Sequence, residues 1–151
     1  MHINAYDNIR NATSVAPQSF TGSTPATGLS VDTLGYDNAK VHVYGAQASG
    51  SPTAASLVAK VQESADGSTN WADALDNTGT VIGFTVSALQ TAAAPGAARI
   101  EGLGLNRKRY LRVVVTPAFT GGTSPAILAY GEIVFGGDAQ QLPITSAVSN
   151  T

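Results

Sequence analysis

The chain has 151 residues, which is enough for one domain with a sizeable core. Only 12% of them are charged and the formal net charge is −2, which argues against nucleic-acid binding because a phosphate backbone is held by a basic surface. The chain has no cysteine, and no apolar stretch approaches the roughly 18 residues that span a bilayer, so disulfides, thiolate metal sites and a membrane segment are not expected.

The N-terminal region, residues 1–28, is predicted to be an extended arm. Asn, Ser, Thr, Pro and Gly dominate from Asn11 to Gly28, and Pro17 and Pro25 oppose helix formation. The first ten residues lack the apolar run of a signal peptide, so synthesis in the cytoplasm is expected. Three apolar side chains of this arm are candidates to contact another protein: Ile3, Tyr6 and Ile9.

Residues 29–135 are predicted to form a body of about eight strands. The strongest pattern is that of residues 108–116, where Leu111, Val113 and Val115 make one apolar face. Turn signals such as Asp66-Gly67 and Gly121-Gly122 separate the apolar runs. Strands are predicted around Leu29 and Val31 and over residues 39–46, 56–63, 71–75, 80–86, 97–101, 108–116 and 126–135.

The C-terminal region, residues 136–151, is predicted to be a second arm. Gly136 and Gly137 interrupt the last strand, and Leu142 and Ile144 are the candidate contacts in the polar segment that follows. Many short strands with turns between them are typical of sandwiches and barrels. The expected fold is therefore an all-β antiparallel sandwich, jelly-roll-like, with about eight strands and extended N- and C-terminal arms.

The sequence offers no organised catalytic or metal-binding group. The two histidines, His2 and His42, are far apart, and nothing in the spacing of the carboxylates selects an acid–base pair. Asp66, Asp73 and Asp76 lie close together but do not match a calcium loop. We therefore expect a protein that is not an enzyme and has no cofactor or metal.

Ser64 to Trp71 resembles the Asp-box hairpins of sialidases and related β-proteins, with the difference that Gly67 follows Asp66 directly. Such boxes are structural turns in which the tryptophan packs onto the sheet. We therefore expect Asp66 to form a turn and Trp71 to be a core residue or a hairpin anchor.

Five of the eight basic residues cluster in the sequence, which leaves three interpretations open. The cluster is a solvated loop and strand face, an interface that pairs with acidic groups of a partner or, with the least support, a nucleic-acid contact. Its members are Arg99, Arg107, Lys108, Arg109 and Arg112.

Several segments, taken in order, resemble a group of small proteins encoded beside the major capsid protein in tailed phages and gene transfer agents. They are Val31 to Ala39, Val61 to Trp71, Arg109 to Thr116 and a closing Gly-rich strand that ends near Pro143. The resemblance covers roughly residues 29–143, and because its motifs are structural, no active-site residue is carried over.

This resemblance implies a virion accessory protein, a capsid decoration or cement protein with a β-sandwich or jelly-roll body. Its expected partner is the major capsid protein, its location is the capsid surface of the virion, and its expected assembly is a homotrimer. The expected contacts are the arm residues Ile3, Tyr6, Ile9, Leu142 and Ile144, together with Arg107, Lys108 and Arg109 opposite acidic capsid loops.

The alternative is a carbohydrate-binding module of a phage fibre or an enzyme. In that case the exposed aromatic residues would bind the sugar, and the candidates are Tyr36, Tyr44 and Tyr130. A hydrolase is the least supported class, because the chain lacks an acid–base constellation.

Overall fold

The computed structural model describes residues 9–102 and 107–136, and this part of the chain forms ten strands. No helix in the described part is long and apolar enough to cross a bilayer. The strands are β1 (Arg10–Thr21), β2 (Ala26–Thr27), β3 (Val31–Asp32), β4 (Asn38–Gly45), β5 (Ala54–Ser64), β6 (Ala72–Asp73), β7 (Gly83–Val86), β8 (Ala94–Glu101), β9 (Tyr110–Thr120) and β10 (Ala126–Gly136).

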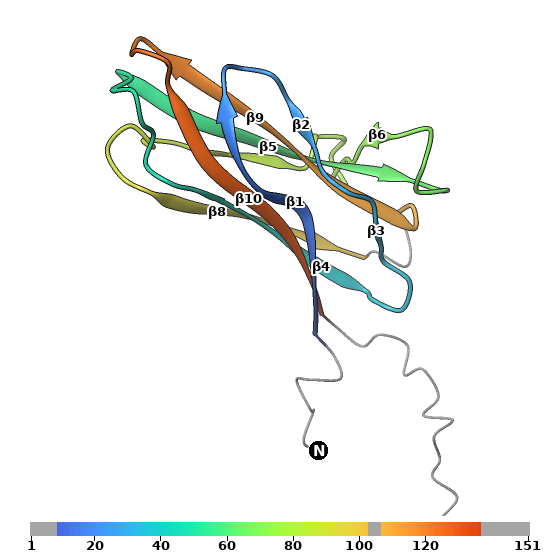
Figure 1. Ribbon diagram of the computed structural model, residues 1–151. Coiled ribbons are helices and arrows are strands. Elements are labelled where there is room, and N and C mark those ends of the chain that lie inside the picture. Colours follow the sequence, from blue (N-terminus) through green and yellow to red (C-terminus); the bar gives the residue numbers. More distant parts are fainter. Residues whose placement is uncertain (1–8, 103–106, 137–151) are drawn as a thin grey trace, which may run out of the picture.

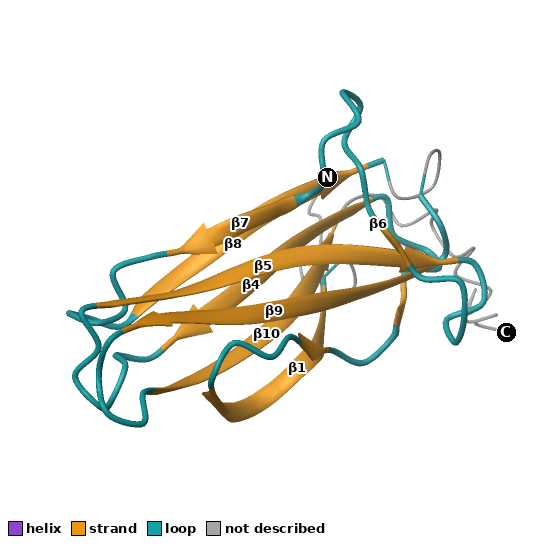
Figure 2. Cartoon of the chain, turned by 90° about the horizontal axis from the view of Figure 1, so that it is seen from above, coloured by secondary structure: helices purple, strands orange, loops and turns teal. Residues whose placement is uncertain are grey.

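The strands form two antiparallel sheets that pack face to face (Figure 1, Figure 2). Sheet A has the order β1-β10-β4-β8, and sheet B has the order β2-β9-β5-β6, with β3 also paired to β9 and β7 to β5. The pairing is nested: β1 pairs with β10, β2 and β3 with β9, β4 with β8, and β5 with β6 and β7. Counting β2 with β3 and β6 with β7 as single interrupted strands leaves eight, and nested pairing of eight strands is the jelly-roll topology. The expected fold class is confirmed.

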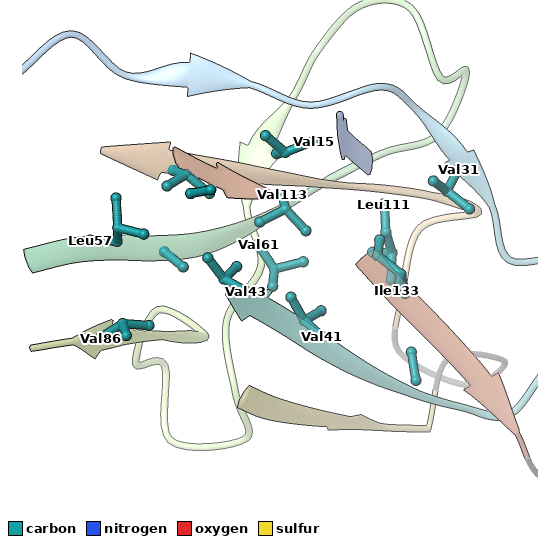
Figure 3. Packing of buried hydrophobic residues seen from close by; sticks show 14 of the residues in the cluster. Val15, Val31, Val41, Val43, Leu57, Val61, Val86, Leu111, Val113 and Ile133 are labelled. Atoms are coloured by element: carbon teal, nitrogen blue, oxygen red, sulfur yellow. The ribbon is translucent and has the colours of Figure 1, made fainter. Parts of the chain in front are cut away.

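The core lies between the sheets and is built from alternating residues of the long strands. Leu57, Ala59 and Val61 of β5 are buried, as are Val41 and Val43 of β4, and the residues between them face outward. Figure 3 shows side chains from both sheets meeting in this layer. Each large apolar side chain buried in this way contributes about 1.5–3 kcal/mol to folding. The apolar faces predicted from the sequence are therefore the core faces.

The N-terminal arm expected over residues 1–28 is wrong for the part that the structure describes. Residues Arg10–Thr21 form β1, which pairs along the whole of β10 with register shifts on both sides of Val15. At this bulge Ser14 and Val15 are both buried, which breaks the alternation that marks a strand in sequence. Pro17 is tolerated because β1 is an edge strand. The body thus begins at Arg10, and residues 1–8 and 137–151 lie outside the described residues.

Candidate functional site

Both ends of the described chain leave the sandwich side by side. Arg10, the first residue of β1, pairs with Phe135 near the end of β10. Gly136, the last residue of β10, pairs with Asn38 at the start of β4 (Figure 1). Residues 1–8 and 137–151 are therefore joined to neighbouring strands at one end of the body, which we call the terminal end.

At the terminal end an ion pair joins β3 to the start of β9 within sheet B, and Arg10 of β1 bonds the same region. Arg109 binds Asp32 with two hydrogen bonds, from Nε to Oδ1 at 3.0 Å and from Nη2 to Oδ2 at 2.7 Å. The Asp32 carboxylate also accepts from the Leu34 backbone N–H, and Arg10 donates to the Asp32 carbonyl. The hydrogen bonds from Arg109 hold the pKa of the Asp32 carboxyl below its usual range. This ion pair thus fixes β3 against β9, beside the first residue of β1.

The three basic residues predicted to contact a partner have different surroundings. Arg107 is mostly buried and lies 3.6 Å from a carboxylate oxygen of Glu63. Lys108 is half-buried, and Arg109 is engaged by Asp32. Arg107 and Arg109 therefore have acidic partners within the chain. The predicted basic cluster is also divided, because Arg99 belongs to sheet A and Arg112 to sheet B.

Exposed apolar side chains surround this end. Ile9, one of the predicted contacts, is 53% exposed, and Leu34, which follows β3, is 68% exposed. Leu29, also 68% exposed, lies farther along the body, where its backbone bonds Ser14 in the middle of β1. Neither Leu29 nor Leu34 is among the contacts predicted from the sequence. The other predicted arm contacts, Ile3, Tyr6, Leu142 and Ile144, lie outside the described residues.

The opposite half of the body carries no charge. It consists of the four loops at the other end and the strand segments that lead into them, and we call it the charge-free half. It comprises residues 15–25, 43–59, 83–98 and 113–131.

A pair of tyrosines lies on the outer face of sheet A within this half. Tyr44 of β4 is directly opposite Tyr130 of β10, and their ring centroids are 5.9 Å apart. Both remain more than a third exposed, as does Leu128 beside them. Tyr36, the third tyrosine expected to be exposed, instead packs on Phe135 at 5.1 Å and is half-buried.

The Asp-box-like segment is a structural turn, as predicted. Asp66 accepts hydrogen bonds from the Ser68 and Thr69 backbone N–H groups and from the Thr69 and Ser64 hydroxyls. These bonds, the one from the Thr69 hydroxyl foremost, lower the pKa of the Asp66 carboxyl. The hydrogen bonds within the turn account for the position of the Asp66 carboxylate.

Trp71 is a hairpin anchor and not a core residue. It is half-exposed, and the Arg112 guanidinium lies 4.1 Å from the centre of its ring. Arg112 donates twice to Gln62, which in turn donates to Asp73. This network holds the β5–β6 hairpin on the outer face of sheet B.

The described residues contain no group of three or more His, Cys, Asp or Glu side chains placed to hold a metal ion. His42 lies in the middle of β4, opposite Glu132 of β10, and His2 is outside the described residues. Two surfaces are the candidates for contact with another molecule: the terminal end and the outer face of sheet A that carries Tyr44 and Tyr130.

No protein-family model matches the sequence, and no curated protein matches it. Among solved structures, the chain is similar to VP2 of infectious bursal disease virus, in a subviral particle, at 13% identity and a TM-score of 0.48. That match covers 89% of this chain and only 34% of the VP2 chain.

Two further structures are similar over most of their own length. The CBM22-1 xylan-binding domain of Xyn10C from Paenibacillus barcinonensis is 12% identical, with 85% of this chain and 81% of that chain covered and a TM-score of 0.44. The SPBc2 prophage-derived protein YomS is 16% identical, with 84% and 93% covered and a TM-score of 0.33. None of these likenesses assigns a family or a function.

Proposed function

We propose that this chain is a structural virion protein that binds the outer surface of a phage capsid and stabilises it. In this role it is a decoration or cement protein that catalyses no reaction, with the major capsid protein as its partner. It is made in the host cytoplasm and resides on the capsid surface. The observation that carries the proposal is the exit of both chain ends, side by side, from one end of a jelly-roll body.

The terminal end suits attachment to another protein surface. Segments that continue from β1 and β10 can pair through their main chains with a neighbour, which gives affinity without long side chains. Ile9 and Leu34 supply apolar area at the terminal end. Many copies on one shell, and association of the copies as a homotrimer, add avidity to each weak contact. The resemblance of residues 29–143 to virion accessory proteins supports the same role.

Truncation tests the attachment, and the structure dictates where the cut must fall. A deletion reaching past Ile9 removes β1 from sheet A and unfolds the edge of the body, so the informative variants lack residues 1–8, 137–151 or both. Binding is measured by co-sedimentation with expanded capsids assembled from the major capsid protein of the same genome. The double truncation should lose binding by roughly tenfold or more while its unfolding midpoint stays unchanged.

The exposed apolar residues at the terminal end have a separate test with a control variant. Replacing Leu34 by Ser should weaken capsid binding, whereas Val58→Ser, at an exposed valine in the charge-free half, should not. If the variant that lacks residues 1–8 and 137–151 bound capsids as strongly as the wild type, attachment through these segments would be refuted.

A second candidate function is carbohydrate binding, and the exposed Tyr44–Tyr130 pair is the observation that favours it. Aromatic rings on a sheet face present apolar area next to polar groups, as sugar rings require. On a glycan array, specific binding that both Tyr44→Ala and Tyr130→Ala abolish, and Leu75→Ala does not, would favour this function over capsid decoration.

A further inference from the structure

In the charge-free half, the outer face of sheet A carries large side chains, whereas the outer face of sheet B carries mainly small ones beside the exposed Val58. On sheet A, Tyr44, Leu128 and Tyr130 project away from the core, with 38%, 57% and 37% of their surface exposed. Pro95 of β8 pairs with Tyr44 and extends the same face. This face is a bulky, uncharged patch, which we call the tyrosine patch.

The opposite face, on sheet B, is a shallow depression lined by small residues. Its volume is about 280 Å³, and it lies between β5, β9 and the β7–β8 loop. Nearly all the lining side chains are Ala, Ser or Thr: Ala54, Ala55, Ser56, Ser87, Ala88, Gln90, Ala118 and Thr120. None of them is charged, so the depression can accept an apolar side chain without desolvating an ion.

The walls of the depression are fixed by the loops behind it. Thr53 N–H donates to the Thr120 carbonyl and Thr123 N–H to the Gly50 carbonyl, both at 2.8 Å. The Gln90 side chain accepts from the Ala55 N–H at 3.1 Å. A Cβ on Gly50 would lie 2.4 Å from the Thr123 carbonyl oxygen, which shows how closely these loops approach. A preformed surface of this kind pays little ordering entropy when a partner binds.

We propose that two copies of this chain associate head to tail, with the tyrosine patch of one copy packed into the depression of the next. The sizes are complementary: bulky side chains on one face meet small ones on the other. Tyrosine is enriched and charge is depleted in the cores of protein interfaces, and both hold here. Identical copies also meet without like-charge repulsion, because neither face carries a charge.

The contact uses two different faces, so each copy can bind a further copy. The copies form a closed ring if the rotation between neighbours brings the last copy back to the first, and an open filament if it does not. It leaves the terminal end free, because the chain ends leave from the other end of the body. The contact rests on the self-association part of the proposed function and not on attachment to a capsid.

Two variants that each block one face test the contact. Leu128→Asp places a charge in the tyrosine patch, and Ala118→Glu places one in the depression. Sedimentation velocity of the purified full-length chain should show association of the wild type, weakened by roughly tenfold or more in each variant. Val81→Asp, at an exposed valine outside both faces, is the matched control and should associate like the wild type.

Mixing the two blocked variants gives the decisive measurement. The Ala118→Glu copy keeps its tyrosine patch and the Leu128→Asp copy keeps its depression, so an equimolar mixture should form a one-to-one dimer and stop there. Association of Ala118→Glu at wild-type strength would show patch-to-patch pairing and overturn the proposal. So would a mixture that stays monomeric, or a monomeric wild type whose tyrosine patch binds a glycan. Unfolding midpoints confirm that each variant is folded.

Capsid co-sedimentation separates this contact from the proposed function. A wild type that associates in solution and ignores capsids would refute the decoration role alone. A capsid-bound wild type with no self-association would refute the head-to-tail contact alone.

Discussion

The Ser14 hydroxyl in sheet A accepts a hydrogen bond from the backbone N–H of Val113 in sheet B, with a distance of 2.9 Å. β9 pairs with β2 at Val114 and with β3 at Leu111, and Val113 lies in the gap between these two ladders. Ser14 fills the gap, because its hydroxyl also donates to the Leu29 carbonyl at 2.9 Å. The Ser14 side chain thus supplies the acceptor for the Val113 N–H, while the Gly28 N–H bonds the Val113 carbonyl, and Ser14 joins the two sheets.

Ser14→Ala should lower the free energy of unfolding by about 1–3 kcal/mol, because the buried Val113 N–H loses its acceptor. Urea denaturation monitored by circular dichroism measures the change. Ser19→Ala, at an exposed position of the same strand, should change stability by less than about 0.5 kcal/mol. Equal effects of the two substitutions would contradict the role assigned to Ser14.

Gly28→Ala should destabilise the body by about 1–3 kcal/mol through crowding, since the added Cβ would lie 2.3 Å from the Ser14 Oγ and 2.8 Å from its backbone. Gly131→Ala is the matched control, because its Cβ would meet Val15 at 3.4 Å, an ordinary contact. Thermal unfolding of the two variants should separate them clearly, and a Gly28→Ala variant as stable as the wild type would refute the close approach.

Asp32→Asn should reduce stability modestly at neutral pH, and the difference from the wild type should disappear in acid. The pKa of Asp32 in the folded state is below its ordinary value of 3.8 because Arg109 binds the carboxylate. The stabilisation is therefore complete above the pKa of the unfolded chain and is lost as the pH falls through the folded-state pKa. Urea midpoints along a pH series measure it. A gap that stays constant in strong acid would rule out the ion pair as its cause.

Arg112→Ala should shift the fluorescence emission of Trp71 to longer wavelength. Trp71 is the single tryptophan of the chain, and the Arg112 guanidinium covers one face of its ring. Removing that cover exposes the indole to water and also releases Gln62. Lys40→Ala, on the outer face of sheet A, should leave the spectrum unchanged.

The sequence predicted the strands whose apolar residues alternate without interruption. Leu111, Val113 and Val115 of β9 were assigned to the correct face because a period of two survives along the strand, and the strand over residues 56–63 was predicted for the same reason. β1 was missed, because the bulge places Ser14 and Val15 on the same side and Pro17 follows within the same strand. Polar composition alone made this strand look like an arm.

The candidate surfaces depend on contacts between distant segments, which explains why the sequence revealed them only in part. Tyr44 and Tyr130 were both placed on outward strand faces, but their pairing follows from the register of β4 with β10. Tyr36 was expected to be exposed because its contact, Phe135, is 99 positions away in the chain. The charge-free half could not be predicted from the sequence, because the fold brings together uncharged loops that are far apart in the chain.

The nested pairing also sets the order in which the molecule can be completed. β1 leaves the ribosome first, and its ladder partner β10 is synthesised last. Sheet A therefore closes only after nearly the whole chain is available, and such distant pairings are typical of slowly folding proteins. Until β10 is synthesised, β1 has no ladder partner within the described part of the chain, in contrast to strands that pair with the next strand in sequence.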